Sequence, residues 1–248
     1  MNSFNELFKV NLKIVYRNRS GLFWTVLMPT FIYSALSVLP LGRSLADGNL
    51  KYSNYLLPGL IAMVIMQSGI YGLAYWMTDL KARGVIKRFL ATPLKLWQMA
   101  LAVVASRLVV IVAQVIVLTL LGVLVFNAEF MGNVLSVLAF VLLGGGIFLL
   151  LGLLISNFAN SYETAAPITS AIGLPLTFLG NIFYPIEVLP RGLQLFAKCL
   201  PITYLADGLR QSYLYAFEFE KISKDLLILA AWLIGVLLIT FKVFRLKE

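Results

Sequence analysis

The sequence has no histidine, a single cysteine and few charged residues. Of its 248 residues, 12% are charged, whereas about a quarter are charged in an ordinary soluble domain. Without histidine the chain lacks the imidazole ligand of haem, zinc and copper sites and the side chain that most often carries protons near neutral pH. The single Cys199 excludes a disulfide within the chain. The composition therefore excludes an ordinary soluble domain and argues against a membrane redox enzyme.

Long apolar runs take the place of the missing charge. The mean hydropathy is +0.91 and 60% of the residues are hydrophobic. Six runs are long enough to cross about 30 Å of hydrocarbon, and none alternates with the period of two that a barrel strand would need. The sequence predicts an all-α integral membrane protein, a single transmembrane domain over residues 1–248. The predicted spans cover about residues 22–41, 55–77, 98–126, 132–156, 164–184 and 226–243.

The basic charge is distributed unevenly between these spans. The formal net charge is +9. If the N-terminus is cytoplasmic, twelve Lys and Arg residues fall on the cytoplasmic side and seven on the other, leaving aside Arg107, which lies within a run. Positive charge concentrates on the cytoplasmic side of membrane proteins. We therefore expect both termini in the cytoplasm of a prokaryotic cell, with membrane lipid rather than nucleic acid as the partner of the charge.

The first residues, 2–19, have an amphipathic pattern. Apolar residues recur at helical spacing, while Lys9, Lys13 and Arg17 step by four along another face. This pattern predicts a helix lying in the membrane interface. A plain basic flank that fixes topology is the alternative.

The stretch from Lys81 to Lys95 contains five cations and no acid. A helix from Val85 to Ala91 would place its charged and its apolar residues on different faces, because positions three and four apart share a face. Gly84 permits a sharp bend before it, and Pro93 disfavours helix at the preceding residue. The separation into a charged and an apolar face indicates a docking element for another protein. A topology anchor, the alternative, would account for the charge alone. Lys87 and Arg88 would project to one side, and Val85, Ile86, Phe89 and Leu90 to the other.

Polar residues within the spans are candidates for a transport pathway. The fifth run contains Pro167, Gly173, Pro175 and Gly180, which is typical either of a helix that lines a cavity or of kinked helix packing. Each polar candidate could instead bond a neighbouring helix. The candidates are Gln67, Ser68, Gln114, Thr169 and Asn181.

Arg107 allows two interpretations. The run from Leu108 to Phe126 is 19 residues long, which is enough to span and would place Arg107 at the cytoplasmic boundary. If the helix begins its crossing at Trp97 instead, Arg107 lies inside the bilayer and becomes a functional candidate.

A segment of about 185–213 precedes the last span. Apolar residues from Leu189 to Leu200 repeat at helical spacing, and Pro190 and Pro201 bound the stretch. The segment is too short and too polar to span, so we expect a re-entrant or interfacial element at the outer leaflet.

Three stretches, "YLLPGLIAM", "RGVIKRFLATPL" and "FYPIEVLPRGLQLFAKCLPITYLADGLRQ", occur in the order found in the membrane subunits of type-two ATP-binding-cassette (ABC) exporters. The chain resembles these subunits over essentially its whole length, and the drug-exporter branch most. The resemblance implies a dimer of membrane subunits, homodimeric or with a close paralogue, each bound to a separate cytoplasmic ATPase that holds the ATP and Mg. This chain has no P-loop and is therefore not expected to hydrolyse ATP. No metal site is expected in it.

The resemblance also implies roles for particular residues. The coupling helix, which sits in a cleft of the ATPase, maps to Arg83, Gly84, Val85, Ile86, Lys87, Arg88, Phe89, Leu90, Thr92 and Pro93. The outer re-entrant element would include Pro185, Pro190, Pro201, Tyr204, Asp207 and Arg210. The chain departs from the family at Ala82 and Val85, where an acid and a threonine are common.

The expected cargo is an amphipathic or lipid-like compound of the drug or antibiotic type. A lipid-linked polysaccharide is the alternative cargo. A membrane sensor or scaffold without transport is an alternative from another class. An intramembrane enzyme is disfavoured, because the spans hold no paired carboxylates.

Overall fold

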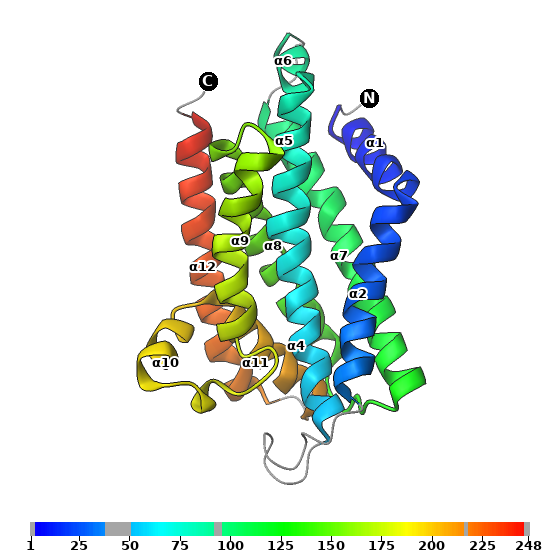
Figure 1. Cartoon of the computed structure of the whole chain (residues 1–248), viewed down its shortest axis with the longest axis vertical. Helices are drawn as coiled ribbons and strands as arrows, with labels where there is room; N and C mark the ends of the chain where they lie inside the picture. Colours follow the sequence, from blue (N-terminus) through cyan, green and yellow to red (C-terminus); the bar gives the residue numbers. More distant parts are fainter. Residues whose placement is uncertain (1–2, 38–50, 92–95, 216–217, 246–248) are drawn as a thin grey trace.

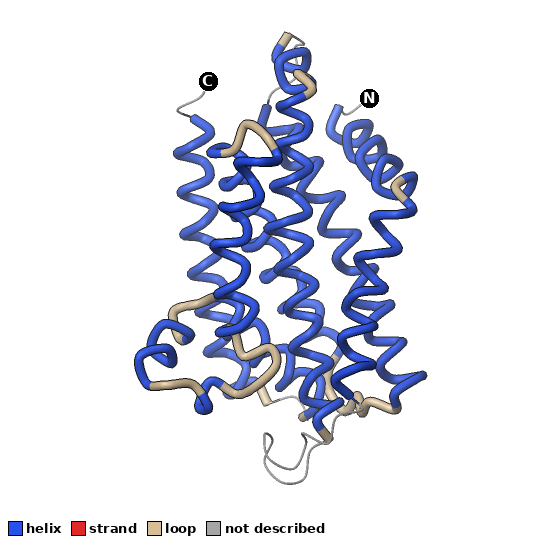
Figure 2. Tube along the Cα trace, in the orientation of Figure 1, coloured by secondary structure: helices blue, strands red, loops and turns tan. Residues whose placement is uncertain are grey.

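The fold is a bundle of helices. The computed structural model describes residues 3–37, 51–91, 96–215 and 218–245, and these residues form helices joined by short turns, with no strand. The long helices run side by side along the longest axis of the molecule (Figure 1; Figure 2). They are α2 (Arg19–Ser37), α4 (Tyr52–Gln67) with its continuation η1 (Ser68–Leu73) and α5 (Ala74–Ala82), α7 (Leu96–Phe126), α8 (Val134–Phe158), α9 (Tyr162–Leu179) and α12 (Phe219–Arg245).

Short helices mark the two ends of the bundle. The amphipathic α1 (Ser3–Arg17) and the basic α6 (Val85–Leu90) lie at the end where α12 finishes (Figure 1). The helices α10 (Arg191–Ala197) and α11 (Pro201–Leu214) lie at the opposite end, and the short η2 (Ile186–Val188) precedes α10 in the chain. We call these the α6 end and the α11 end. Helix α1 and the basic loop thus lie at one end, as expected for elements on the same side of a membrane.

Helix α4 lies at the centre of the bundle. Fourteen of its 16 residues are buried, and it packs against α2, α7, α8 and α11. A helix that is apolar all round is stable only where other apolar surface covers every face. Because α4, η1 and α5 are continuous, they form a central rod that joins the two ends.

The middle of the rod is a π-helix, η1, which the sequence did not predict. The wider turn brings the backbone at Gly69 against α8, where a Cβ added at Gly152 would lie 2.2 Å from the Gly69 carbonyl oxygen. A Cβ at Gly69 would in turn lie 2.5 Å from the backbone carbonyl carbon of Phe148. Small residues permit this close approach of membrane helices.

The predicted membrane class is confirmed, whereas the number of spans remains a prediction. Within the part of the chain that the structure describes, four helices are long and apolar enough to cross a membrane: Tyr52–Ala82, Trp97–Phe126, Val134–Phe158 and Ile222–Val243. The apolar part of α2, Phe23–Ser37, is shorter, and residues 38–41 of the predicted first span lie outside the described residues.

The predicted fifth span was too long at its end. Helix α9 ends at Leu179, and Gly180 follows as its cap. Asn181 then takes a left-handed backbone conformation with φ 57°, which asparagine tolerates better than most residues. The chain turns away here, so residues 180–184 do not continue the helix.

We expect Gly152→Ala to destabilise the bundle by about 1–3 kcal/mol. The added methyl group would lie against the Gly69 carbonyl, a backbone group that cannot rotate away, so α8 and η1 would be forced apart. The thermal unfolding midpoint of the purified chain in detergent measures the effect. Gly235→Ala in α12 is the matched control, since nothing lies within 4 Å of its added Cβ. Equal midpoints for the two variants would contradict the close contact at Gly152.

Candidate functional site

The first candidate site is the bend between α5 and α6. Gly84 has φ 70°, a left-handed conformation that glycine adopts without strain. Its N–H donates to the Lys81 carbonyl over 2.9 Å, and the Arg83 N–H donates to the Asp79 carbonyl over 3.0 Å. These bonds end α5 and turn α6 out at the tip of the molecule (Figure 1). The bend predicted at Gly84 is confirmed.

Helix α6 carries exposed cations on a short, firmly attached element. Lys87 and Arg88 are exposed, Val85 is 36% exposed, and Ile86 packs against the core. The helix ends at Leu90, one residue before the predicted Ala91, which lies in a turn. Thr92 and Pro93 lie outside the described residues, so the predicted stop at Pro93 stays a prediction.

The α5 helix beneath the bend is tied to its surroundings. The Lys81 ammonium donates to the carbonyl of Ser156 in the last turn of α8, where a cation also compensates the negative end of the helix dipole. Arg83 Nε lies 2.9 Å from Asp79 Oδ1. This acid stands one turn before Ala82, where the resemblance noted in the sequence leads one to expect an acid. A displacement of α6 would therefore be passed to α5 and α8.

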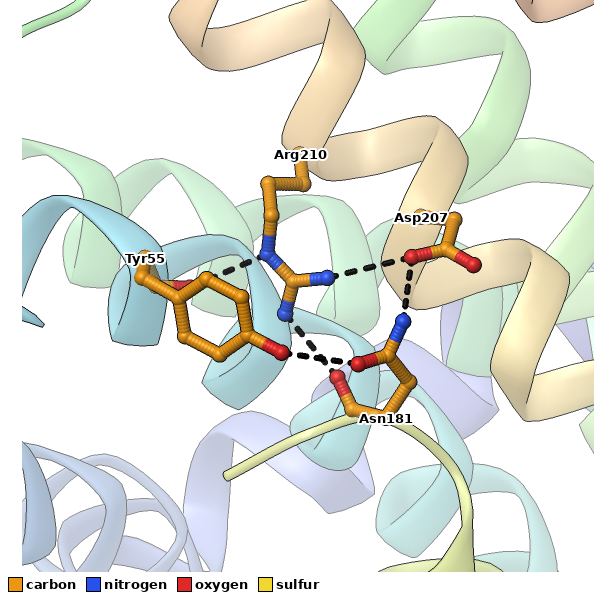
Figure 3. Close-up of polar contacts among 4 residues, drawn as sticks. All are labelled: Tyr55, Asn181, Asp207 and Arg210. Carbon is orange, nitrogen blue, oxygen red and sulfur yellow. Dashed lines mark hydrogen bonds and ion pairs between the residues drawn. The ribbon is translucent and has the colours of Figure 1, made fainter. Parts of the chain in front are cut away.

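The second candidate site is a polar network at the α11 end, made of Tyr55, Asn181, Asp207 and Arg210 (Figure 3). Arg210 Nη2 donates to the Asn181 carbonyl over 2.9 Å, and Nη1 lies 3.1 Å from Asp207 Oδ1. The Tyr55 hydroxyl donates to Asn181 Oδ1 over 2.7 Å, and the Asn181 amide donates to the Asp207 carboxylate. The network thereby joins α4, the turn after α9, and α11.

The surroundings of Arg210 stabilise its positive charge. Its side chain is 10% exposed, and its guanidinium carbon lies 3.7 Å from the centre of the Tyr55 ring, which adds a cation–π attraction. Burial raises the pKa of Asp207, and the neighbouring Arg210 lowers it in part. The ion pair and the ring together keep the charge of Arg210 satisfied within the bundle.

The remaining polar candidates lie in two places along the rod. In the middle, the Ser68 hydroxyl donates to Gln114 Oε1 over 2.8 Å, joining η1 to α7, while Gln67 beside them is half-buried. Nearer the α6 end, the hydroxyls of Tyr75 and Thr169 are 2.8 Å apart and join α5 to α9. Among the described residues, no three acidic or cysteine side chains gather closely enough to hold a metal ion.

The five predicted pathway residues are therefore not brought together. Ser68 and Gln114 form one pair, Thr169 bonds α5, and Asn181 belongs to the network at the α11 end. Of the re-entrant residues, Asp207 and Arg210 meet in that network, whereas Tyr204 donates its hydroxyl to the Lys198 carbonyl over 2.6 Å. The prolines Pro185, Pro190 and Pro201 stand where η2, α10 and α11 begin.

The tyrosines of the rod and of α9 are residues that the sequence did not single out. Tyr55 and Tyr75 both supply hydroxyls to the contacts above. Tyr71, Tyr75 and Tyr162 form a file of rings with centroids 6.0 and 4.8 Å apart. The spacing of Tyr71 and Tyr75, one turn apart on a predicted helix, was the available signal.

A family model described as ABC-2 type transporter matches residues 2–214. The chain belongs to this family. The matched region includes α1, the α5–α6 bend and the whole Arg210 network, so both candidate sites lie within it.

Curated relatives of this ABC-2 chain are named as permeases. The protein "Probable multidrug ABC transporter permease YbhR" of Escherichia coli (strain K12) is 25% identical over 69% of this chain, and the chain spans only 47% of that relative's length. The daunorubicin resistance ABC transporter permease protein DrrB1 of Streptomyces coeruleorubidus is 29% identical over 75% of this chain and 66% of its own length. A protein named as a transport permease, YvfS of Bacillus subtilis (strain 168), is 26% identical over 100% of this chain and 99% of its own.

We expect Arg210→Gln to lower the thermal unfolding midpoint of the ABC-2 chain clearly, with a loss of about 2 kcal/mol, because Asp207 is left partly buried without its cation. Arg191→Gln in α10 is the matched control, since residue 191 is exposed at the same end. If both variants unfold at the wild-type temperature, the network does not hold α11 in place.

Proposed function

We propose that the chain is the membrane subunit of an ABC exporter, driven by a separate cytoplasmic ATPase subunit that holds the ATP and Mg. The observation that carries the proposal is the α5–α6 bend: a short helix with exposed cations, turned out at the end of a buried rod. Such a helix is suited to a groove on another protein. Membership of the ABC-2 family supports an ATP-binding partner in that role.

The mechanism follows from how the helices are connected. When ATP draws two ATPase subunits together, α6 moves with its ATPase and tilts the rod as a rigid body. The tilt is passed to α8 through Lys81 and the close contact at Gly152. At the α11 end, the Arg210 network makes α11 follow α4. A path between two membrane subunits, two copies of this chain or a copy and a paralogue, then opens on the far side.

The cargo we propose is an amphipathic compound with an aromatic ring. Relatives named as a multidrug ABC transporter permease and as a daunorubicin resistance permease support this class. The file of Tyr71, Tyr75 and Tyr162 gives it a physical basis, because half-exposed rings can stack on a flat cargo. Tyr162 is 64% exposed near the α6 end, and Tyr71 reaches the middle of the rod, so the file runs in the direction of export.

The docking role of α6 predicts a charge effect. We expect the double variant Lys87→Glu and Arg88→Glu to reduce co-purification with the ATPase at least tenfold, because like charges would replace complementary ones. Arg191→Glu with Lys198→Glu at the α11 end is the matched control and should bind normally. Co-purification of the α6 variant at the wild-type level would refute docking through this helix.

The transport role predicts ATP-dependent movement of an aromatic dye into inverted vesicles that hold both subunits. We expect Tyr75→Ala to raise the KM for the dye by about 3- to 10-fold, the amount one lost ring stack is worth, with kcat changed less. Tyr215→Ala is the control, since Tyr215 is 48% exposed at the opposite end. ATP hydrolysis without movement of any compound in a broad panel would favour a sensor or scaffold.

A further inference from the structure

Arg107 in α7 is the charged residue that the proposed mechanism leaves unused. It lies on the side of α7 that faces the bundle, one turn from the buried Val103, 1% exposed, and one turn from Ile111, 0% exposed. Arg107 itself is partly exposed. Its guanidinium carbon lies 5.2 Å from the centre of the Trp76 ring on α5. The cation is thus held in a fixed place, with part of its surface open.

The guanidinium of Arg107 has no anionic partner among the described residues. The ion pairs among the described residues are Lys9–Glu6, Arg83–Asp79 and Arg210–Asp207. The acids of the neighbouring elements α1 and α5, Glu6 and Asp79, are therefore already paired. A guanidinium carries five N–H donors in a planar fork, and a partly buried donor without a partner costs free energy. An anion from outside the chain would remove this cost.

The length of α7 places Arg107 near a membrane boundary. From Arg107 to Phe126, where α7 ends, the chain needs about 30 Å at a rise of 1.5 Å per residue, which equals the hydrocarbon thickness of a bilayer. Trp76, whose ring lies against the Arg107 guanidinium, is of a residue type enriched at membrane interfaces. The length of α7 and the tryptophan therefore point to the same depth.

Helix α1 supports this depth. It packs against α7 and leaves Phe4, Val10, Ile14 and Tyr16 exposed. An amphipathic helix with such exposed apolar residues lies in the zone between headgroups and acyl chains. Arg107 lies in the first half of α7, which begins at the α6 end where α1 lies, so lipid headgroups are the anions available near it.

We propose that Arg107, held by Trp76, binds the phosphate of a phospholipid in the leaflet at the α6 end. The guanidinium fork matches two phosphate oxygens, which gives two parallel charge-assisted hydrogen bonds. The acyl chains would extend from there into the hydrocarbon. A soluble anion would have to reach this depth without acyl chains to hold it.

The test uses the purified full-length chain alone, so it does not depend on an ATPase or on transport. Phosphatidylglycerol is added to the chain in detergent, the thermal unfolding midpoint is followed, and bound lipids are counted by native mass spectrometry. We expect a saturable rise of the midpoint. Diacylglycerol, which lacks the phosphate, and inorganic phosphate, which lacks the chains, should give no rise.

Variants identify the residue. We expect Arg107→Gln to need at least about tenfold more phosphatidylglycerol for the half-maximal shift, as for the loss of one charged hydrogen bond. The concentration for Arg107→Lys should lie between those of the wild type and the Gln variant, because lysine keeps the charge and loses the planar fork of donors. The Lys variant serves as the test if Arg107→Gln does not fold. Arg17→Gln is the matched control, an exposed arginine of α1, and should behave as wild type.

Three outcomes would overturn the proposal. Equal lipid affinity in the wild type and both Arg107 variants would show that the phosphate binds elsewhere. An equal shift with inorganic phosphate would make the ligand a soluble anion. An equal shift with diacylglycerol would show that only the acyl chains matter.

Discussion

The structure depends on the burial of one continuous rod, α4–η1–α5, among the other helices. In lipid no water is available for polar groups, so each must find its partner inside the protein. The polar contacts of the rod follow this constraint. Tyr55 bonds Asn181, Ser68 bonds Gln114, and Tyr75 bonds Thr169. Each pair joins the rod to a different stretch of chain, and together they fix the neighbours around it.

The same rod connects the two candidate sites. Its start contributes Tyr55 to the network that holds α11, and its end carries α6 on the bend at Gly84. Between them the π-helix brings Gly69 against Gly152, where backbone meets backbone. Contacts of this kind have little room to deform continuously, so neighbouring helices move together. This is the physical reason to expect that a push on α6 reaches the α11 end.

Much of this arrangement could be predicted from the residues. The bend at Gly84, the interruption of the segment after α9 by prolines, and the amphipathic α1 each follow from local chemistry. The same holds for four of the long spans. The π-helix could not be predicted, because its wider turn is favoured by contact with α8. The end of α9 was placed too late, because the apolar run continues past Leu179 while Asn181 is turned back by its bonds to Tyr55, Asp207 and Arg210.

The sequence by itself determined that this is a membrane protein, that it is helical and where its cations cluster. These properties follow from composition and periodicity, which need no knowledge of neighbours. Only the tertiary structure decided which polar groups meet. The candidates Gln114, Thr169 and Asn181 read alike in the sequence, yet they lie in three separate contacts. Arg210 pairs with Asp207 three positions earlier on its own helix, which helical spacing allows. Its bonds to Asn181 and to the Tyr55 carbonyl, and the contact of Arg107 with the Trp76 ring, depend instead on how separate elements pack, and the sequence contains no information about that.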